Sequence, residues 1–217
     1  MIKCNTSIPA QLSNFSIMNR ERNRVAYDKK AANYDDTLDG QFTEKFKRLL
    51  LEHMAFRDDD YVLDVGCGNG TLLARMAKSK KINGFGIDVS PQMIQQAKNR
   101  YPEFDFVVSG CENTPFEENS MDIVTVCAAY HHFPNVDAFA QEAKRVLKPN
   151  GSLYIAEVHI PALIRPIANI FLPLSKDGDV KFYSSTEIAA TCSKVGFHLV
   201  NTVRRGHIQI IQLRKQT

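Results

Sequence analysis

The feature that most limits how this chain can fold is a regular alternation of short apolar runs and amphipathic segments, which starts near residue 61. The runs YVLDV, INGFGIDV, FDFVVSG, MDIVTVCAA and SLYIAEV have the length and composition of buried strands. The segments between them carry apolar residues at helical spacing, most clearly at 136–147. This alternation predicts an α/β protein with a largely parallel sheet that helices cover on both faces.

Local signals mark where several of these elements begin and end. Ser90-Pro91 predicts a helix N-cap followed by proline at the first helical position, and Asn150-Gly151 predicts a turn after the helix at 136–147. The sequence SSTE at 184–187 predicts a capping box that opens another helix. The final runs FHLVNTV and HIQIIQLR predict a hairpin that adds an antiparallel edge to the sheet.

Before residue 60 the sequence predicts one strong helix. Its apolar side chains in register are Phe42, Phe46, Leu49, Leu50 and Met54. Farther upstream, Phe15 and Ile17 are interpreted as part of an arm that covers a ligand, and the rest of residues 1–20 as a mobile end.

Composition limits the class of protein. A chain of 217 residues with 44% hydrophobic residues fits one soluble globular domain. A net charge of +3, carried by scattered basic residues, gives no sign of a nucleic-acid partner. The N-terminus lacks the apolar core of a secretory leader, and no apolar run reaches the ~18 to 20 residues that span a bilayer. We therefore expect a cytoplasmic protein without stable membrane insertion.

The cysteines are odd in number and widely spaced. They are Cys4, Cys67, Cys111, Cys127 and Cys192. They form no C-x-x-C pair and no disulfide framework, so we expect reduced thiols and no metal site. Cys67 and Cys127 are interpreted as small packing groups, because the sequence places no activating base beside them.

The stretch VLDVGCGNG at 62–70 ends the first predicted strand in a glycine-rich turn. Gly66, Gly68 and Gly70 permit positive φ and let a ligand approach the backbone closely. Ligands of doubly wound sheets bind beyond the carboxyl ends of the strands, so this turn is the predicted site. A dinucleotide fold requires G-x-G-x-x-G, and Thr71 at the third glycine position argues against a pyrophosphate and a nicotinamide-dependent reductase.

Two carboxylates flank the turn. Asp64 lies inside the strand end, where it can accept hydrogen bonds from a cationic group such as an ammonium. Asp88 ends the second predicted strand, where a carboxylate can accept from both hydroxyls of a ribose. The turn therefore suits a ligand with a ribose, a positive end and no phosphates, and S-adenosylmethionine has all three properties.

Several stretches together resemble the class I S-adenosylmethionine-dependent methyltransferases. They are VLDVGCGNG, GIDVSPQMIQQAK, ENTPFEENSMDIV, HHFPNVDAF and RVLKPNGSLYIAE, and the similarity covers about residues 60–158. Within that family the chain resembles the small-molecule enzymes related to ubiquinone and menaquinone biosynthesis. The resemblance implies a Rossmann-like three-layer sandwich with a seven-stranded, mostly parallel sheet and an antiparallel last strand.

The resemblance also implies a division of the chain. Residues 1–58 would form a helical cap or lid, in which AYDKKAANYD is similar to a segment that closes over the cofactor. Residues 59–158 would form the S-adenosylmethionine-binding core. Residues 159–183 would be a substrate lid, and 184–217 a helix and hairpin that complete the sheet.

Cofactor contacts follow from the positions that match the family's motifs. The methionine portion is expected at Gly66, Cys67, Gly68, Asn69 and Gly70, its amino group at Cys127 and Ala128, and the sulfonium beside Tyr27 and Tyr34. Asp88 is expected to bind the ribose, with Val89 and Met93 against the adenine.

Many relatives carry an aspartate that accepts from the adenine amino group where this chain has Gly110. The backbone of Cys111 and the side chain of Glu112 are the alternative contacts.

Two histidines just past the fourth strand, His131 and His132, are the candidate catalytic residues, since histidine titrates near neutrality. A sulfonium is already an activated methyl donor, so a base is needed only when the acceptor atom is protonated. The alternative is that one histidine hydrogen-bonds the loop HHFPN.

The segment HIPALIRPIANIFLPLSK at 159–176 is apolar and carries three prolines. It predicts a pocket for an apolar or aromatic acceptor, with packing over the sheet or a dimer contact as the alternatives. A membrane contact is disfavoured because Arg165 supplies little charge for anionic lipid.

The predicted function is methyl transfer from S-adenosylmethionine to a small-molecule acceptor, with S-adenosylhomocysteine as product, by a monomer or homodimer. A non-catalytic S-adenosylmethionine-binding protein and a nicotinamide-dependent reductase are the alternatives. Nucleic-acid methylation is disfavoured, because the chain lacks the Asn/Asp-Pro-Pro-Tyr motif that grips a flipped base and has no basic groove pattern.

Overall fold

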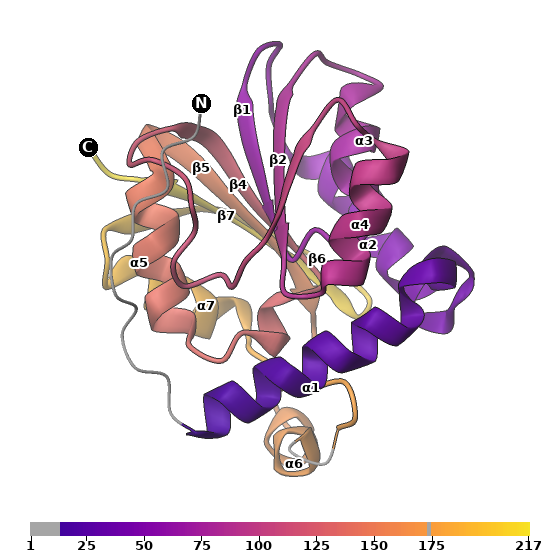
Figure 1. The fold of residues 1–217 in the computed structure, drawn as a ribbon. Coiled ribbons are helices and arrows are strands. Elements are labelled where there is room, and N and C mark those ends of the chain that lie inside the picture. Colours follow the sequence, from indigo (N-terminus) through magenta and orange to yellow (C-terminus); the bar gives the residue numbers. More distant parts are fainter. Residues whose placement is uncertain (1–13, 173–174) are drawn as a thin grey trace.

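A seven-stranded sheet with the strand order β3-β2-β1-β4-β5-β7-β6 forms the centre of the protein (Figure 1). The parallel strands in the first part of the chain are β1 (Tyr61–Val65), β2 (Asn83–Asp88), β3 (Asp105–Val108), β4 (Met121–Cys127) and β5 (Leu147–Val158). The final hairpin consists of β6 (Phe197–Arg205) and β7 (Ile208–Lys215), and β7 runs antiparallel to both β5 and β6. The predicted Rossmann-like sheet with its reversed last strand is confirmed.

The structure is a computed structural model, and it describes residues 14–172 and 175–217. Cys4 and residues 1–13 of the expected mobile end at 1–20 lie outside the described residues, as does the side chain of Phe15, whereas the later part of that end is helical. The four described cysteines are free and buried.

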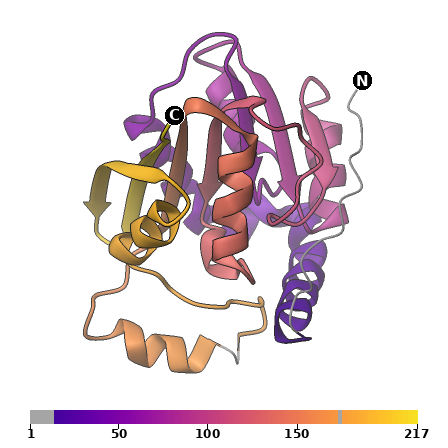
Figure 2. The ribbon, with the colours of Figure 1, turned by 90° about the vertical axis from the view of Figure 1, so that its left-hand side faces the viewer.

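Helices cover both faces of the sheet, as Figures 1 and 2 show. On one face lie α5 (Val136–Val146) and α7 (Ser185–Ser193); on the other lie α2 (Leu38–His53), α3 (Thr71–Ala77) and α4 (Pro91–Arg100). Leu63 of β1 joins the apolar core beneath α5, whereas its neighbour Val62 joins the core beneath α2. Successive side chains of one strand thus serve two cores, which is why these strands are apolar throughout.

The predicted helix starts agree with the structure. The Ser90 side chain accepts from the amide of Met93 at 3.1 Å, with Pro91 in the first turn of α4. Ser184 and Glu187 form the predicted capping box of α7. The fifth strand starts earlier than expected. It begins at Leu147 and includes Pro149, whereas the predicted apolar run begins at residue 152.

The N-terminal region holds more structure than the sequence indicated. It consists of α1 (Asn14–Lys30), a short 3-10 helix η1 (Ala31–Asp36) and α2, so the predicted strong helix is present as α2 and two further helices precede it. The buried side chains of α1 include Asn19 and Asn23, and a polar inner face gives no apolar periodicity to detect. In Figure 1, α1 runs past the carboxyl ends of the parallel strands.

The segment after β5 stands apart from the sheet. It contains α6 (Arg165–Phe171), none of whose residues is buried, and which projects from the body in Figure 2. Leu163 just before it is 90% exposed and Ile170 within it 71% exposed. The Asn169 side chain tethers α6 by bonding to both the amide and the carbonyl of Phe182, at 2.8 and 3.1 Å. No helix of the described stretches is long and apolar enough to cross a bilayer.

Replacing Gly40 with alanine tests how closely η1 packs on α2. A Cβ on Gly40 would overlap the carbonyl oxygen of Tyr34. Helix propensity alone would make the change stabilising by up to about 1 kcal/mol. We expect the clash to prevail, so that Gly40→Ala lowers the free energy of unfolding by about 1–3 kcal/mol in urea denaturation. The exposed neighbour substitution Gln41→Ala is the control, and a Gly40→Ala protein as stable as this control would contradict the packing.

Candidate cofactor and acceptor site

One cavity lies at the carboxyl ends of β1, β2 and β4, beneath α1 and η1, with an empty volume of about 840 Å³ that includes its open mouth. Of the residues predicted from the sequence, it is lined by Tyr27, Tyr34, Gly66, Cys67, Gly68, Asn69, Asp88, Val89, Gly110, Cys111, Glu112, Cys127, Ala128 and His132. Asp64, Gly70, Met93 and His131 are not among its lining residues. The structure therefore brings most of the predicted site together, and the contacts to a cofactor stay predictions.

The glycine turn between β1 and α3 has three left-handed residues. The φ angles are 74° at Gly66, 53° at Gly68 and 80° at Gly70. A Cβ on Gly66 would lie 2.6 Å from the Cβ of Ala129, and a Cβ on Gly70 would lie 2.7 Å from the ring of Phe106. Gly66 and Gly70 thus permit close packing within the protein, whereas a Cβ on Gly68 would meet no atom within 4 Å, so Gly68 presents bare backbone to the cavity.

Asp88 holds this turn in place. One of its oxygens accepts from the amide of Gly68 at 2.9 Å, and the other accepts from the amide of Ser90 at 2.8 Å. Burial raises the pKa of Asp88, and the amide donors at Ser90 and Gly68 oppose that rise. The carboxylate therefore lies in the cavity wall, where each oxygen already has one donor and a lone pair to spare.

Asp64 lies behind the cavity wall. It is 2% exposed and accepts from the hydroxyl of Thr125 at 2.8 Å. Burial raises its pKa to about 7, against the hydrogen bond from Thr125 and the charge of Lys47. Its predicted contact with an ammonium group stays a prediction, and the structure places Thr125 at one of its oxygens.

The end of the cavity near Gly110 carries an ion pair that the sequence did not indicate. Arg20 of α1 contacts Glu112 at 2.6 Å, and a Cβ on Gly110 would lie 3.2 Å from its guanidinium group. The glycine therefore leaves room for the guanidinium group of Arg20. The second oxygen of Glu112, Oε1, is buried and has no hydrogen-bond partner within the described residues.

Met93, expected against the adenine, is fully buried and packs with Ala31 and Tyr34 instead of lining the cavity. It lies on α4 in contact with the residues of η1. Val89, the other residue expected there, does line the cavity.

Polar contacts hold η1 over the glycine turn. Asn69 of the turn donates to Asp35 at 2.8 Å, and Arg100 of α4 bonds to the same carboxylate at 2.5 Å. The hydroxyl of Tyr34 lies 3.3 Å from that of Thr43 on α2. Burial raises the pKa of Tyr34 to about 12. The segment expected to close over the cofactor is thus fixed by contacts with the glycine turn, α4 and α2.

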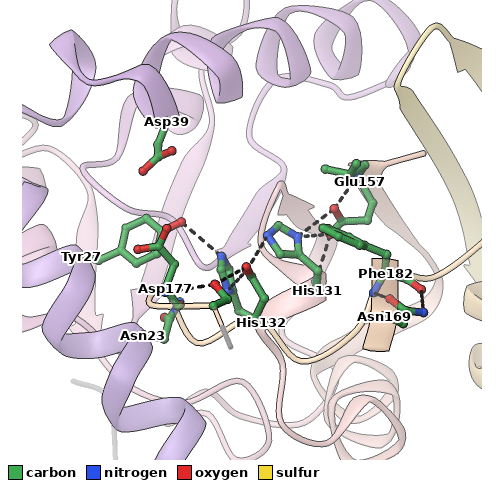
Figure 3. Close-up of polar contacts among 12 residues, drawn as sticks. Asn23, Tyr27, Asp39, His131, His132, Glu157, Asn169, Asp177 and Phe182 are labelled. Carbon is green, nitrogen blue, oxygen red and sulfur yellow. Dashed lines mark hydrogen bonds and ion pairs between the residues drawn. The ribbon is translucent and has the colours of Figure 1, made fainter. Parts of the chain in front are cut away.

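A second set of contacts joins α1 to the segment after α6 (Figure 3). Lys30 at the end of α1 bonds to Asp39 at 2.6 Å and to Asp177 at 2.7 Å. The side chain of Asn23 donates to the carbonyl of Asp177 at 3.0 Å. The N-terminal helices and the predicted substrate lid are therefore joined through the ammonium group of Lys30.

The two predicted catalytic histidines face different partners (Figure 3). Nδ1 of His131 lies 2.9 and 3.0 Å from the two oxygens of Glu157, which is fully buried. Nε2 of His132 lies 3.2 Å from the hydroxyl of Tyr27, and its Nδ1 lies 3.0 Å from Asp179. Proton transfer by either residue stays a prediction, and only His132 lines the cavity.

Burial and neighbouring charges shift the pKa values of the two histidines in opposite directions. Burial lowers the pKa of His131, but Glu157 and Asp179 outweigh it and leave the pKa raised. Burial and the neighbouring His131 lower the pKa of His132. Burial also raises the pKa of Tyr27 well above its usual value, so its hydroxyl stays protonated.

Several lining residues were missed by sequence reasoning. They are Arg20, Asn23, Thr43, Lys47, Val65, Ile87, Ser109, Ala129, Phe133 and Pro134. Lys47 is the one with a readable signal, because a lysine beside Phe46 and three residues before Leu50 falls on the buried side of α2. It is 8% exposed, and its ammonium has no hydrogen bond or ion pair among the described residues.

The predicted acceptor segment contributes differently from what was expected. No described residue of 159–183 lines the cavity, and the apolar side chains of α6 face solvent. The segment reaches the site through Asp177 and Asp179, which contact Lys30 and His132.

Asp64 gives a testable pH dependence. Its folded pKa of about 7 lies above the unfolded value of about 3.9, so the folded state binds the extra proton between these values. Stability contributed by this proton is present below about pH 4 and is lost as the pH rises to 7. Between about pH 4 and 7, the free energy of unfolding of the wild type should fall by up to about 1.4 kcal/mol per pH unit relative to that of Asp64→Asn.

Urea denaturation of both proteins across this pH range measures the difference. Asp105→Asn, an exposed carboxyl at the start of β3, is the matched control. A wild-type protein that gains stability relative to Asp64→Asn as the pH rises would contradict the burial argument.

Comparison with known proteins agrees with the fold and with the glycine turn. Residues 63–155 match the family described as a methyltransferase domain. Over 177 residues the chain is 29% identical to an uncharacterized methyltransferase of Synechocystis, covering 79% of this chain and 83% of that protein. It is 37% identical over 100 residues to the demethylmenaquinone methyltransferase of Chlorobaculum tepidum, covering 46% of this chain and 41% of the relative.

Among solved structures, a SAM-dependent methyltransferase from Aquifex aeolicus superposes with a TM-score of 0.61 at 20% identity. The superposition covers 79% of this chain and 97% of that structure, and it concerns the fold. The chain thus shares the fold of that structure, and its residues 63–155 match a methyltransferase domain.

Proposed function

We propose that the protein transfers the methyl group of S-adenosylmethionine to a small-molecule acceptor bound in the same cavity. The observation that carries the proposal is a single cavity that joins three elements of different origin. The glycine turn and Asp88 line it, and α1 passes over it so that Arg20 meets Glu112 whereas Tyr27, about two helical turns farther along, meets His132. A nucleoside with a sulfonium centre spans such a cavity from its base to its methyl group.

The polar groups of the cavity fit this cofactor. The unpartnered Oε1 of Glu112 can accept a hydrogen bond from the adenine amino group, so it can replace the carboxylate missing at Gly110. The unpaired ammonium of Lys47 offers a partner to the carboxylate of the methionine portion. Asp88 offers acceptors to the ribose hydroxyls, and the bare backbone at Gly68 permits close approach of a ligand.

The bound cofactor supplies an activated methyl group on sulfur, and the protein's part is to bind, orient and exclude water. Burial raises the pKa of Cys67 and of Cys127 well above the usual thiol value. Both thiols therefore stay protonated and poorly nucleophilic beside a reactive methyl donor. The neutral hydroxyls of Tyr27 and Tyr34 can border the sulfonium without competing for its methyl group.

A small, partly aromatic acceptor suits the remaining end of the cavity. Phe133, Pro134 and the ring of Tyr27 supply apolar wall there, and His132 supplies a polar atom. Relatives that share the domain include demethylmenaquinone methyltransferases, which points to an aromatic or quinone-like ring as the first acceptor class to test.

Binding measurements test the cofactor half of the proposal. Isothermal calorimetry should detect S-adenosylmethionine binding and no binding of NADH. Asp88→Ala should weaken S-adenosylmethionine affinity by about 10- to 100-fold, because two carboxyl acceptors are lost from the cavity wall. Asp105→Ala is the control, and both variants are checked for folding by thermal denaturation. Equal affinity in Asp88→Ala, or preferential binding of NADH, would remove the proposal.

Turnover tests the transfer step. Release of S-adenosylhomocysteine is measured with a panel of naphthoquinols, phenols and catechols, with the Asp88→Ala protein as the blank. We expect release with at least one ring class. Tight cofactor binding without release on any acceptor would favour the non-catalytic alternative.

The side chain of Glu112 should determine which nucleobase the cavity prefers. S-inosylhomocysteine carries a carbonyl where S-adenosylhomocysteine carries the amino group, so it meets the Glu112 carboxylate with an acceptor. Wild type should prefer the adenosyl compound by about tenfold or more, and Glu112→Ala should lose most of that preference. The exposed acid substitution Glu117→Ala should keep it. An undiminished preference in Glu112→Ala would rule out this contact.

A further inference from the structure

His131, His132 and Asp179 form a cluster beside the cavity, and the meeting of Asp179 with the two histidines was not predicted. One ring nitrogen from each histidine and a carboxylate oxygen of Asp179 lie within 4.8 Å of one another. The same oxygen of Asp179 is 3.0 Å from His132 and 3.6 Å from His131. Metal–ligand bonds of about 2.0–2.1 Å at a tetrahedral centre place ligand atoms roughly 3.3 Å apart.

We propose that these three side chains bind one divalent transition-metal ion, of which zinc is the most suitable probe. Two imidazoles and one carboxylate are a ligand set that zinc and neighbouring first-row metals accept. Three protein ligands leave at least one coordination position for water or an acceptor oxygen. The proposal concerns metal binding and does not depend on methyl transfer.

The atoms behind the three ligands are arranged as the outer shell of a metal site. Metal-bound histidines commonly donate their other ring nitrogen to a carboxylate or another oxygen. Nδ1 of His131 faces the buried carboxylate of Glu157, and Nε2 of His132 faces the hydroxyl of Tyr27. The second oxygen of Asp179 accepts from the hydroxyl of Ser175 at 2.6 Å.

No hydrogen bond joins the facing atoms of the cluster within the described residues. The His132 side chain is 9% exposed, and its Nδ1 lies 3.0 Å from Asp179 without the geometry of a hydrogen bond. In the neutral form of His131 that donates Nδ1–H to Glu157, Nε2 carries a lone pair and lies 3.6 Å from Asp179, too far for a hydrogen bond. A cation between these atoms satisfies all three at once.

The competing explanation is an ion-pair network without metal, in which a protonated His131 bridges Glu157 and Asp179. That network leaves Nδ1 of His132 unpartnered in a buried place, which costs about 1–3 kcal/mol. The two explanations differ in whether the protein takes up a metal ion.

Metal binding would also fix the predicted substrate lid. Asp179 comes from the segment after α6, whereas both histidines come from η2 (Tyr130–His132) at the end of β4. The ion would therefore fasten the lid to the end of the sheet, next to the acceptor end of the cavity.

Titration of chelator-treated protein with Zn²⁺ and Co²⁺ tests the site, without any nucleoside present. Wild type should bind one equivalent of zinc and gain thermal stability. His132→Ala and Asp179→Asn should each lose at least about 100-fold in affinity, since losing an outer partner alone costs about 10- to 100-fold. The matched controls are His159→Ala and Asp137→Asn, which should bind zinc as wild type does.

The spectrum of the Co²⁺ complex identifies the ligands. Nitrogen and oxygen ligands give visible bands without the sulfur-to-metal charge transfer that cysteine ligation would produce. No binding by wild type, undiminished binding by both cluster variants, or a thiolate spectrum would each overturn the proposal. Should His132→Ala fail to fold, Asp179→Asn decides, because that side chain lies outside the sheet core.

Discussion

The candidate site depends on the way Asp88 holds the turn after β1. Its carboxylate accepts from the amides of Gly68 and Ser90, so it joins the turn to the start of α4. The amide of Gly66 donates to the carbonyl of Ile87, which ties the turn to the end of β2 as well. These bonds fix left-handed glycines, which few other residues could replace, in the one place where a ligand can meet bare backbone. The arm formed by α1 and η1 is built over this fixed floor.

The sheet and its helices were predictable because their residues repeat. Strands buried on both faces form nearly continuous apolar runs, and helices such as α5 carry apolar residues at helical spacing. Both patterns can be recognised in the sequence. Caps at Ser90 and Ser184 are short-range signals of the same kind. The glycine turn was readable because its geometry demands a rare residue at fixed positions. The reversed last strand came from family resemblance and from the hairpin pattern.

The parts that could not be predicted depend on contacts between distant segments. The inner face of α1 is polar, with Asn19 and Asn23 buried, so no period marks it as a buried helix. Arg20 fills the space that Gly110 leaves, but nothing in the local sequence of either residue connects them. The partners of the histidines, Glu157 and Asp179, come from β5 and from beyond α6, and a single sequence carries no sign that these positions meet.

The shared ammonium of Lys30 couples two segments that lie far apart in the sequence. It bridges Asp39 on α2 and Asp177 beyond α6. Each of these partly exposed contacts contributes at most about 1 kcal/mol, so neither one locks its segment in place. When one carboxylate moves away, the lysine pairs more fully with the other, and a movement of the segment after α6 is therefore felt at the start of α2.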